Sequence, residues 1–357
     1  MVAARSKCRT GPPSEVEVNR RFLTGRILPL VFLLCCIGIC YGEGSEPTGV
    51  YPLIFFGRVL LADAPRLELR RAGTLSPAAP MVAADAAGRI WGRLEPRYFA
   101  ALDPVRDRIV TRVKLPHKSH IFLITRAGKA YVTHRSPTRE GYSISVVDTR
   151  QGMLLRELKG IAGLPVDLAE AAGFVYLAAD GVLRDDPMES HLYQIEEETD
   201  RIHEVLDSSD TGYSWKITAA GDRLYLGYLP SRENPWNGRV EVRDVRTFRL
   251  LRSWEASPGP LRGLYASERQ VLLFSEGKGG GTELLLLDPL LNAASQARLL
   301  EGPVARVLGV HGSRLVYLDY PFEAGYTNVS VRFYDLEAGR ELKRINIRDY
   351  LIAKGTE

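Results

Sequence analysis

Cysteine is missing from most of this chain. The four cysteines all precede residue 41, at Cys8, Cys35, Cys36 and Cys40. The remainder of the chain therefore has neither a disulfide framework nor a thiolate metal site. A charge surplus is lacking as well: the chain has 47 Lys and Arg against 43 Asp and Glu, and six of the former and two of the latter precede residue 43. Without a basic surplus the chain does not fit a nucleic-acid binder, so we expect no nucleic-acid partner.

Linear motifs of catalysis and metal binding are lacking too. Gly277–Gly281 is rich in glycine, but a phosphate-binding loop needs Ser or Thr after its lysine and a helix behind it. No Gly-x-Ser-x-Gly sequence is present, so no catalytic residue can be named from a motif. On a strand or loop the side chains of His117 and His120 would diverge, and we expect both to be exposed. We accordingly expect no metal and no cofactor.

Long hydrophobic runs are absent except near the N-terminus, where residues 27–41 follow a basic segment. Fifteen residues span about 22 Å as a helix, short of the roughly 30 Å of a bilayer core. A short apolar run behind basic residues is typical of a signal peptide, so residues 1–42 are interpreted as one, cut after Gly42. An uncleaved membrane anchor or lipidation at Cys40 stays an alternative, with membrane contact limited to this segment. The expected location is periplasmic or extracellular.

What the chain does have is a repeat: an acidic residue followed by a tight turn occurs seven times. The seven residues, 40, 45, 48, 48, 44 and 47 positions apart, are Asp63, Asp103, Asp148, Glu196, Asp244, Asp288 and Asp335. A period in the forties built from short strands is the signature of a β-propeller, in which each repeat is one four-stranded blade. We therefore expect an all-β fold, with residues 43–357 forming a single propeller of seven blades. Six blades is the alternative, if the first strands only complete another blade.

The third repeat shows the expected unit most clearly. β-Branched and aromatic residues predict strands over 120–125, 130–134, 142–148 and 153–158, with Gly and Asp in the turns. Tyr131 in the second strand recurs as Tyr176, Tyr225 and Tyr317, and we expect these rings to pack between blades. Strands over 50–56, 58–62 and 67–71 would form the first blade, with 350–353 as a candidate for an additional strand that joins the two termini.

Two strands of this third repeat carry a family resemblance. Tyr131–His134 reads Tyr-Val-Thr-His, and Ser143–Asp148 reads Ser-Ile-Ser-Val-Val-Asp. The chain resembles the YVTN-type β-propeller repeat family, whose hallmark is a Tyr-Val-Thr-Asn strand followed by an Ile-Ser-Val-Ile-Asp strand. The resemblance is strong in this repeat and fades in the others. It implies an extracytoplasmic propeller of the lactonase- or NHL-like kind, and such families include binding proteins and some enzymes.

Loop length predicts which face of the propeller is functional. The connections between second and third strands are long, while those between first and second strands are short. Since the long connections would emerge together on one face, we expect ligand or partner contacts there. Arginines and aromatics are the residue types that anchor interfaces. Those we select from the long loops are Arg135, Arg184, Arg232, Trp236, Tyr320, Phe322 and Tyr326.

Two functions of different classes fit this sequence. The first is an exported propeller that acts as a binding or scaffold protein, presenting its loop face to a protein, peptide or glycan partner in the cell envelope. The alternative is a propeller enzyme, similar to a lactonase or a dehydrogenase, with its site at the mouth of the central channel. Fold alone does not choose between them.

Overall fold

The computed structural model describes residues 49–76, 79, 81–134, 141–180, 190–207, 214–228, 239–255, 261–277, 281–292, 297–319 and 328–354. These residues form seven antiparallel sheets, numbered blades 1 to 7 along the chain. Residues 1–48, which include the expected signal peptide, lie outside the described residues.

Blade 1 has three strands and blades 2 to 7 have four each. Blade 1 contains β1 (Val50–Phe55), β2 (Arg58–Asp63) and β3 (Glu68–Thr74). Blade 2 contains β4 (Val82–Ala84), β5 (Ile90–Glu95), β6 (Tyr98–Asp103) and β7 (Arg108–Lys114). Blade 3 contains β8 (Ser119–Ile124), β9 (Lys129–His134), β10 (Tyr142–Asp148) and β11 (Met153–Ile161). Blade 4 contains β12 (Leu164–Ala171), β13 (Phe174–Asp180), β14 (Ser190–Glu196) and β15 (Ile202–Asp207). Blade 5 contains β16 (Ser214–Ala220), β17 (Arg223–Tyr228), β18 (Arg239–Asp244) and β19 (Leu250–Glu255). Blade 6 contains β20 (Leu261–Ala266), β21 (Val271–Glu276), β22 (Thr282–Leu287) and β23 (Arg298–Leu300). Blade 7 contains β24 (Val304–His311), β25 (Arg314–Asp319), β26 (Ser330–Asp335) and β27 (Arg340–Asn346).

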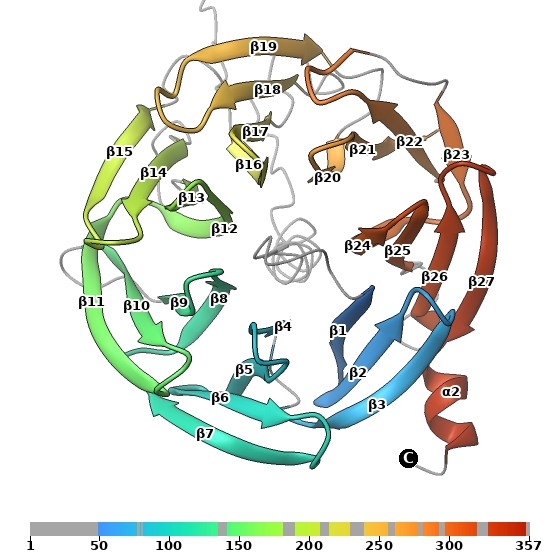
Figure 1. Cartoon of the computed structure of the whole chain (residues 1–357), viewed down its shortest axis with the longest axis horizontal. Coiled ribbons are helices and arrows are strands. Elements are labelled where there is room, and N and C mark those ends of the chain that lie inside the picture. Colours follow the sequence, from blue (N-terminus) through green and yellow to red (C-terminus); the bar gives the residue numbers. More distant parts are fainter. Residues whose placement is uncertain are drawn as a thin grey trace, which may run out of the picture. The chain divides into compact units, whose positions relative to one another are not determined.

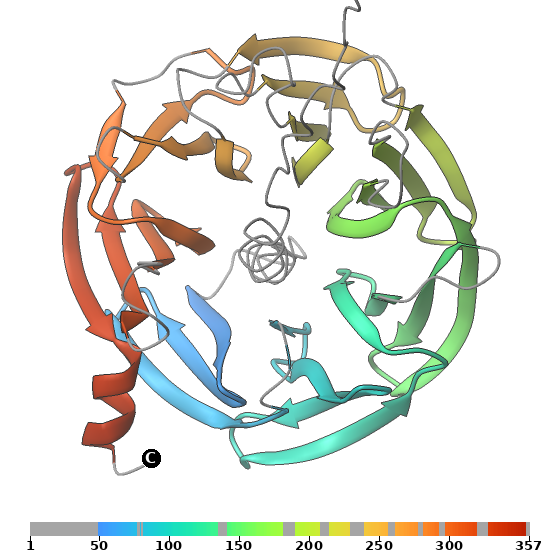
Figure 2. The same ribbon diagram turned by 180° about the vertical axis from the view of Figure 1, so that it is seen from behind.

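The seven sheets stand side by side in a closed ring, which confirms the expected seven-bladed propeller (Figure 1). The innermost strands β1, β4, β8, β12, β16, β20 and β24 contact one another in this order, and β24 contacts β1 again. The same ring is seen from behind in Figure 2. The strands expected in the third repeat and in the first blade are all present, with ends shifted by at most three residues.

Burial explains why the strands differ in sequence from the inside of a blade to the outside. Middle strands such as β10 are buried on both faces, because neighbouring blades cover both sides of the sheet. Outer strands such as β7 alternate between exposed and partly buried residues, because one of their faces meets solvent. The large rings of Trp91, Tyr131, Tyr176 and Tyr225 are fully buried between the blades.

The segment 350–353 is not a strand, contrary to expectation: it belongs to helix α2 (Ile347–Ala353), on the outer rim beside β27 and β3 (Figure 1). The side chain of Asn346 caps the helix by accepting the Asp349 N–H. Ile347 and Leu351, one helical turn apart, are both buried while Asp349 between them is exposed, which fits a helical period and not the alternation of a strand. No helix in the described part of the chain is long and apolar enough to cross a membrane.

The acidic residue of each repeat organises the turn that follows the third strand. Asp148 accepts the backbone N–H groups of Arg150 and Gln151 at 2.8 and 2.9 Å, and Asp335 accepts those of Glu337 and Ala338, both at 2.9 Å. Backbone bonds of this kind favour the charged carboxylate and lower the pKa of Asp103, Asp244 and Asp335, and the side chain of Asn292 is the main cause of the lowered pKa of Asp288. The turn chemistry therefore explains why the acidic residue recurs.

The carbonyl directly after this acidic residue joins most blades to the one before. In six of the seven junctions a side chain of the preceding blade donates a hydrogen bond to that carbonyl. The pairs are Arg89 to Thr149 (2.6 Å), Lys129 to Glu197 (2.5 Å), Tyr176 to Val245, Tyr225 to Pro289 (2.9 Å), Arg298 to Leu336, and Arg314 to Ala64 (2.9 Å). The last of these closes the ring between blades 7 and 1. The expectation that the recurrent tyrosines pack between blades is confirmed for Tyr131, Tyr176 and Tyr225, whose hydroxyls each bond the next blade.

Among the described residues, blade 1 has no counterpart of the innermost strand of the other blades. Gly49 has φ +73° and accepts the Ala64 N–H, as Gly128 (φ +88°) accepts the Thr149 N–H in blade 3. Gly128 precedes the second strand of blade 3, so β1 is equivalent to a second strand although it lies innermost in its sheet. By the alternation of an antiparallel pair, Val50, Pro52 and Ile54 turn their backbone groups away from β2. Pro52 has no N–H to offer there, which suits an edge strand.

Candidate functional site

The topology separates the two ends of the blades. At one end, which we call the turn face, first strands lead to second strands and third strands lead to outer strands, through short turns except between β22 and β23. At the other end, the loop face, second strands lead to third strands and outer strands lead to the next blade. In blades 3 to 7 the second-to-third connections leave gaps in the described residues, the longest between β17 and β18. In blades 1 and 2 the same connections are tight turns.

The seven residues selected from the sequence all belong to these long connections. Arg135, Arg184, Arg232, Trp236, Tyr320, Phe322 and Tyr326 lie outside the described residues. The structure therefore locates the strand ends from which their loops leave, but not their side chains. The described residues at the base of those loops provide the site geometry that follows.

Blade 3 holds a polar cluster at the loop face. The Nε2 atom of His117, on the link from blade 2, lies 3.2 Å from Oε1 of Glu157 on β11. The Ser143 hydroxyl on β10 donates to the same oxygen at 2.6 Å. The His134 ring at the end of β9 packs edge-on against His117, with ring centroids 5.3 Å apart. One carboxylate thus organises groups from three segments of the chain.

His134 is the buried member of this cluster. Its Nε2 atom lies 2.9 Å from the Ser145 hydroxyl, and both residues are fully buried. Burial lowers the pKa of His134 to about 4, and His117 nearby acts in the same direction, so the imidazole is neutral at ordinary pH. A serine beside a neutral histidine resembles a nucleophile with its base. With neither residue exposed, however, a substrate cannot reach this pair in the described conformation.

The expectation that His117 and His120 are exposed linker histidines is wrong for His120, which is 8% exposed. His117 is partly exposed. Its ring contacts that of His134, although His117 lies on the link between blades and His134 lies at the end of a second strand. The spacing of residues in the sequence did not predict this cluster, because one member lies on the link between blades 2 and 3 and the others lie on three different strands. The strand register offers a signal: Glu157 is the cross-strand partner of Ser145, so the turn after Asp148 already brings Glu157 to this end of the blade.

Blade 4 repeats the arrangement with different residues. His191 on β14 contacts Glu204 on β15, with 2.6 Å between Nδ1 and Oε1, and its ring stacks on Tyr193. Tyr193 and Glu204 are cross-strand partners, as Ser145 and Glu157 are in blade 3. The His191 side chain is mostly buried, while half of the Glu204 carboxylate side chain faces solvent. A fixed histidine–carboxylate pair therefore borders the loop face in two adjacent blades.

Blades 5 and 7 place buried ion pairs at the same level. In blade 5 the Glu241 carboxylate contacts Arg239 at 3.0 Å and Arg243 at 2.7 Å. In blade 7 Arg332, which is 3% exposed, donates to Asp319 through Nε at 2.8 Å and Nη2 at 2.5 Å. Arginine–carboxylate contacts of this kind hold side chains in one geometry. They brace the strand ends that carry the long loops.

A second group of buried carboxylates lies at the turn face, between blades 3 and 4. Both oxygens of Glu170 accept the Arg126 N–H, each at 3.1 Å, and burial raises the pKa of Glu170 to about 7. Asp200 accepts from Tyr131 at 2.8 Å and Lys129 at 2.9 Å. Every contact crosses from one blade to the next, so these groups join blades. Among the described residues, no set of three or more His, Cys, Asp or Glu side chains is arranged to hold a metal ion.

Comparison with known proteins supports the fold. No protein-family model matches the chain, and no curated protein matches it in sequence. Among solved structures, hydrazine synthase of Kuenenia stuttgartiensis is similar with a TM-score of 0.55 at 14% identity, over 74% of this chain and 85% of that one. The dihydro-heme d1 dehydrogenase NirN in complex with DHE gives 0.52 at 12% identity, over 87% and 77%. The tricorn protease gives 0.58 at 10% identity, over 87% of this chain but 35% of that one. At such identities the likeness shows the propeller fold alone.

Proposed function

We propose that this chain is an exported β-propeller of YVTN-like type that binds a protein, peptide or glycan partner in the cell envelope through its loop face. The observation that carries the proposal is the uneven distribution of connection lengths. In blades 3, 4, 5 and 7 the longest connection joins the second strand to the third, and these connections lie on one face of the ring, whereas in blade 6 the longest connection joins β22 to β23 at the turn face. A rigid ring that gathers its long loops on one side is a scaffold for recognition.

The described base of the loop face supports this proposal. Histidine–carboxylate pairs in blades 3 and 4 and arginine–carboxylate contacts in blades 5 and 7 fix the strand ends under the loops. Phe56, in the tight β1–β2 turn of blade 1, adds an aromatic ring that is 63% exposed at the same face. Fixed strand ends reduce the entropy that the loops lose on binding, which favours affinity.

A pull-down with the full chain from the envelope fraction of its own cells tests the proposal. The loop-face variant combines Arg232→Ala with Trp236→Ala. The matched control combines Val105→Ser with Arg106→Ala in an exposed turn of the turn face, where Val105 is 91% exposed. We expect wild type and control to retain a partner that the loop-face variant loses, with at least a tenfold drop in recovery.

Two results would count against the binding proposal. A partner lost from the turn-face control and kept by the loop-face variant would place recognition on the opposite side of the ring. If wild type captures no partner, the alternative of an enzyme with a site at the channel mouth gains weight. A screen with lactones and redox substrates then tests that alternative.

A further inference from the structure

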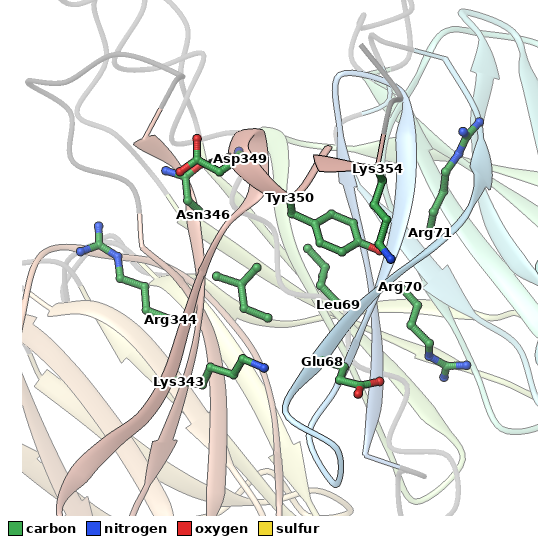
Figure 3. Close-up of a pocket in the computed structure, with 11 residues that line it drawn as sticks. Glu68, Leu69, Arg70, Arg71, Lys343, Arg344, Asn346, Asp349, Tyr350 and Lys354 are labelled. Atoms are coloured by element: carbon green, nitrogen blue, oxygen red, sulfur yellow. Dashed lines mark hydrogen bonds between the residues drawn. The ribbon is translucent and has the colours of Figure 1, made fainter. Parts of the chain in front are cut away.

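A hollow lies on the outer rim at the seam, the junction where blade 7 meets blade 1 and the ring closes. It has a volume of about 1160 Å³ and is formed by β3, β27 and α2 (Figure 3). Its apolar lining comes from Leu69 and Ile345, with the half-buried ring of Tyr350 beside them. Neither the loop face nor the channel includes this surface. Its chemistry therefore needs a separate explanation.

Positive charge dominates the lining of this seam groove. Five cationic side chains face two carboxylates there: Arg70, Arg71, Lys343, Arg344 and Lys354 against Glu68 and Asp349. The chain beyond residue 42 has equal numbers of basic and acidic residues, so this surplus is local. A concave surface with one sign of charge attracts ligands of the opposite sign.

Some of these cations already have partners and others do not. Arg70 contacts Asp63 at 3.3 Å, and Arg344 lies 3.6 Å from Asp319. Lys343 and Lys354 are exposed and form no ion pair with any described residue. Figure 3 shows Tyr350 and Leu69 between Lys354 on one side and Lys343 on the other. Two unpaired amines thus flank an apolar and aromatic floor.

The backbone at the groove suits an extended chain. β3 and β27 are the outermost strands of blades 1 and 7, so each has one edge without a strand partner in the described sheets. Edge strands supply N–H and C=O groups to an added peptide, while side pockets select its residues. Tyr350 would contact an apolar side chain of the peptide, and Lys343 and Lys354 would contact its carboxylates.

We propose that the seam groove binds an acidic polypeptide segment of a partner protein, with its carboxylates on Lys343 and Lys354 and an apolar side chain on Leu69 and Tyr350. The free edges of β3 and β27 favour a peptide over an anionic membrane, because a peptide backbone can pair with a strand edge and a lipid headgroup cannot. The proposal concerns a surface separate from the loop face and stands without the proposed function.

The test measures binding of a fluorescent twelve-residue peptide of Glu-Glu-Leu repeats to the full chain by fluorescence anisotropy. The seam variant combines Lys343→Gln with Lys354→Gln, and the control combines Arg150→Gln with Arg246→Gln on exposed turns of the turn face. We expect the seam variant to bind at least tenfold more weakly and the control to bind like wild type. Affinity should fall as salt is raised from 50 to 500 mM, because exposed charges are screened.

Three results would overturn the proposal. Equal loss in both variants would show a general charge effect, and no binding by wild type would show that the groove does not take acidic peptides. The third is preference for phosphatidylglycerol vesicles over the peptide, lost in the seam variant, which would make the groove a membrane contact. All four substituted residues are exposed, and equal melting temperatures of the three proteins verify that each is folded.

Discussion

Single residues stabilise this ring mainly through backbone groups. The carboxylate that ends a third strand fixes its turn, and the next carbonyl accepts a donor from the preceding blade. Buried acids such as Glu170 also join neighbouring blades, and their burial raises their pKa and so disfavours the charged carboxylate. Each donor–carbonyl bond contributes about 1 kcal/mol, and more where the donor is charged. Because such a bond recurs at most junctions of the ring, the sum of these contributions is a substantial part of the stability of the fold.

The raised pKa of Glu170 predicts a pH dependence of stability. In the unfolded chain its pKa is near 4.5, and in the fold it is about 7. The folded state therefore holds the proton more tightly, and stability falls as pH rises from about 4.5 to about 7. The full shift corresponds to roughly 3 kcal/mol.

Urea unfolding of wild type and Glu170→Gln at pH 5, 6, 7 and 8 tests this prediction. The amide keeps an acceptor for the Arg126 N–H but does not ionise. We expect the variant to lose less stability than wild type between pH 5 and pH 7. Identical pH profiles for the two proteins would mean that Glu170 is ionised in the folded state without cost.

At the scale of elements, blade 1 differs from the rest. β1 lies innermost although its glycine turn and its pairing with β2 match a second strand. An open edge at this position would invite pairing with another chain, and Pro52 removes one of the donors that such pairing needs. On the opposite side of the blade, α2 covers part of the outer rim through Ile347 and Leu351.

Amide hydrogen exchange along β1 tests the open edge. Tyr51, Leu53 and Phe55 face β2 and should exchange slowly, whereas Val50 and Ile54 should exchange at least a hundredfold faster. In β9 of blade 3 both sets should be slow, because β8 and β10 pair with its two edges. Slow exchange at Val50 and Ile54 would instead show that a further strand occupies the inner position of blade 1.

At the scale of the whole molecule, no blade formed by the described residues combines strands from both ends of the chain. The seam between blades 7 and 1 depends on Arg314, on α2 and on side-chain packing, in which Tyr51 fills the space beside Gly309. A Cβ at Gly309 would lie 2.1 Å from the Tyr51 ring, so no larger residue fits there. Because these side chains join the first blade to the last, we expect the fold to be sensitive to substitutions at this junction.

Arg314→Met should therefore destabilise the fold. Its Nη1 atom donates to the carbonyls of Ala64 and Pro65 at 2.9 and 2.8 Å, and loss of both bonds should cost about 1 to 3 kcal/mol. We expect the melting temperature to fall by about 2 to 6 °C. The control is Arg223→Met, whose arginine forms an ion pair only with the exposed Asp222 among the described residues, at 3.9 Å. Equal effects of the two substitutions would contradict the role of Arg314 in closure.

The sequence predicts the fold well because the repeat is local. Each turn is specified by its own acidic residue and glycine, and the strand limits follow from them. Helix α2 was not predicted, because it contacts β3 through Tyr350 and the Arg71 backbone, and β3 lies almost 280 positions earlier in the chain. The cluster of His117, His134 and Glu157 was missed for a similar reason: only the register of blade 3 brings these residues together. Long-range packing decided both cases.

The central claim, recognition through the loop face, is tested most directly by photo-crosslinking in intact cells. A photoreactive phenylalanine analogue replaces Trp236 at the loop face in one protein and Val105 at the turn face in another. Crosslinked partners are separated by mass, and their peptides are identified by mass spectrometry. We predict a specific adduct from position 236 and none from position 105. An adduct from position 105 alone would contradict recognition through the loop face.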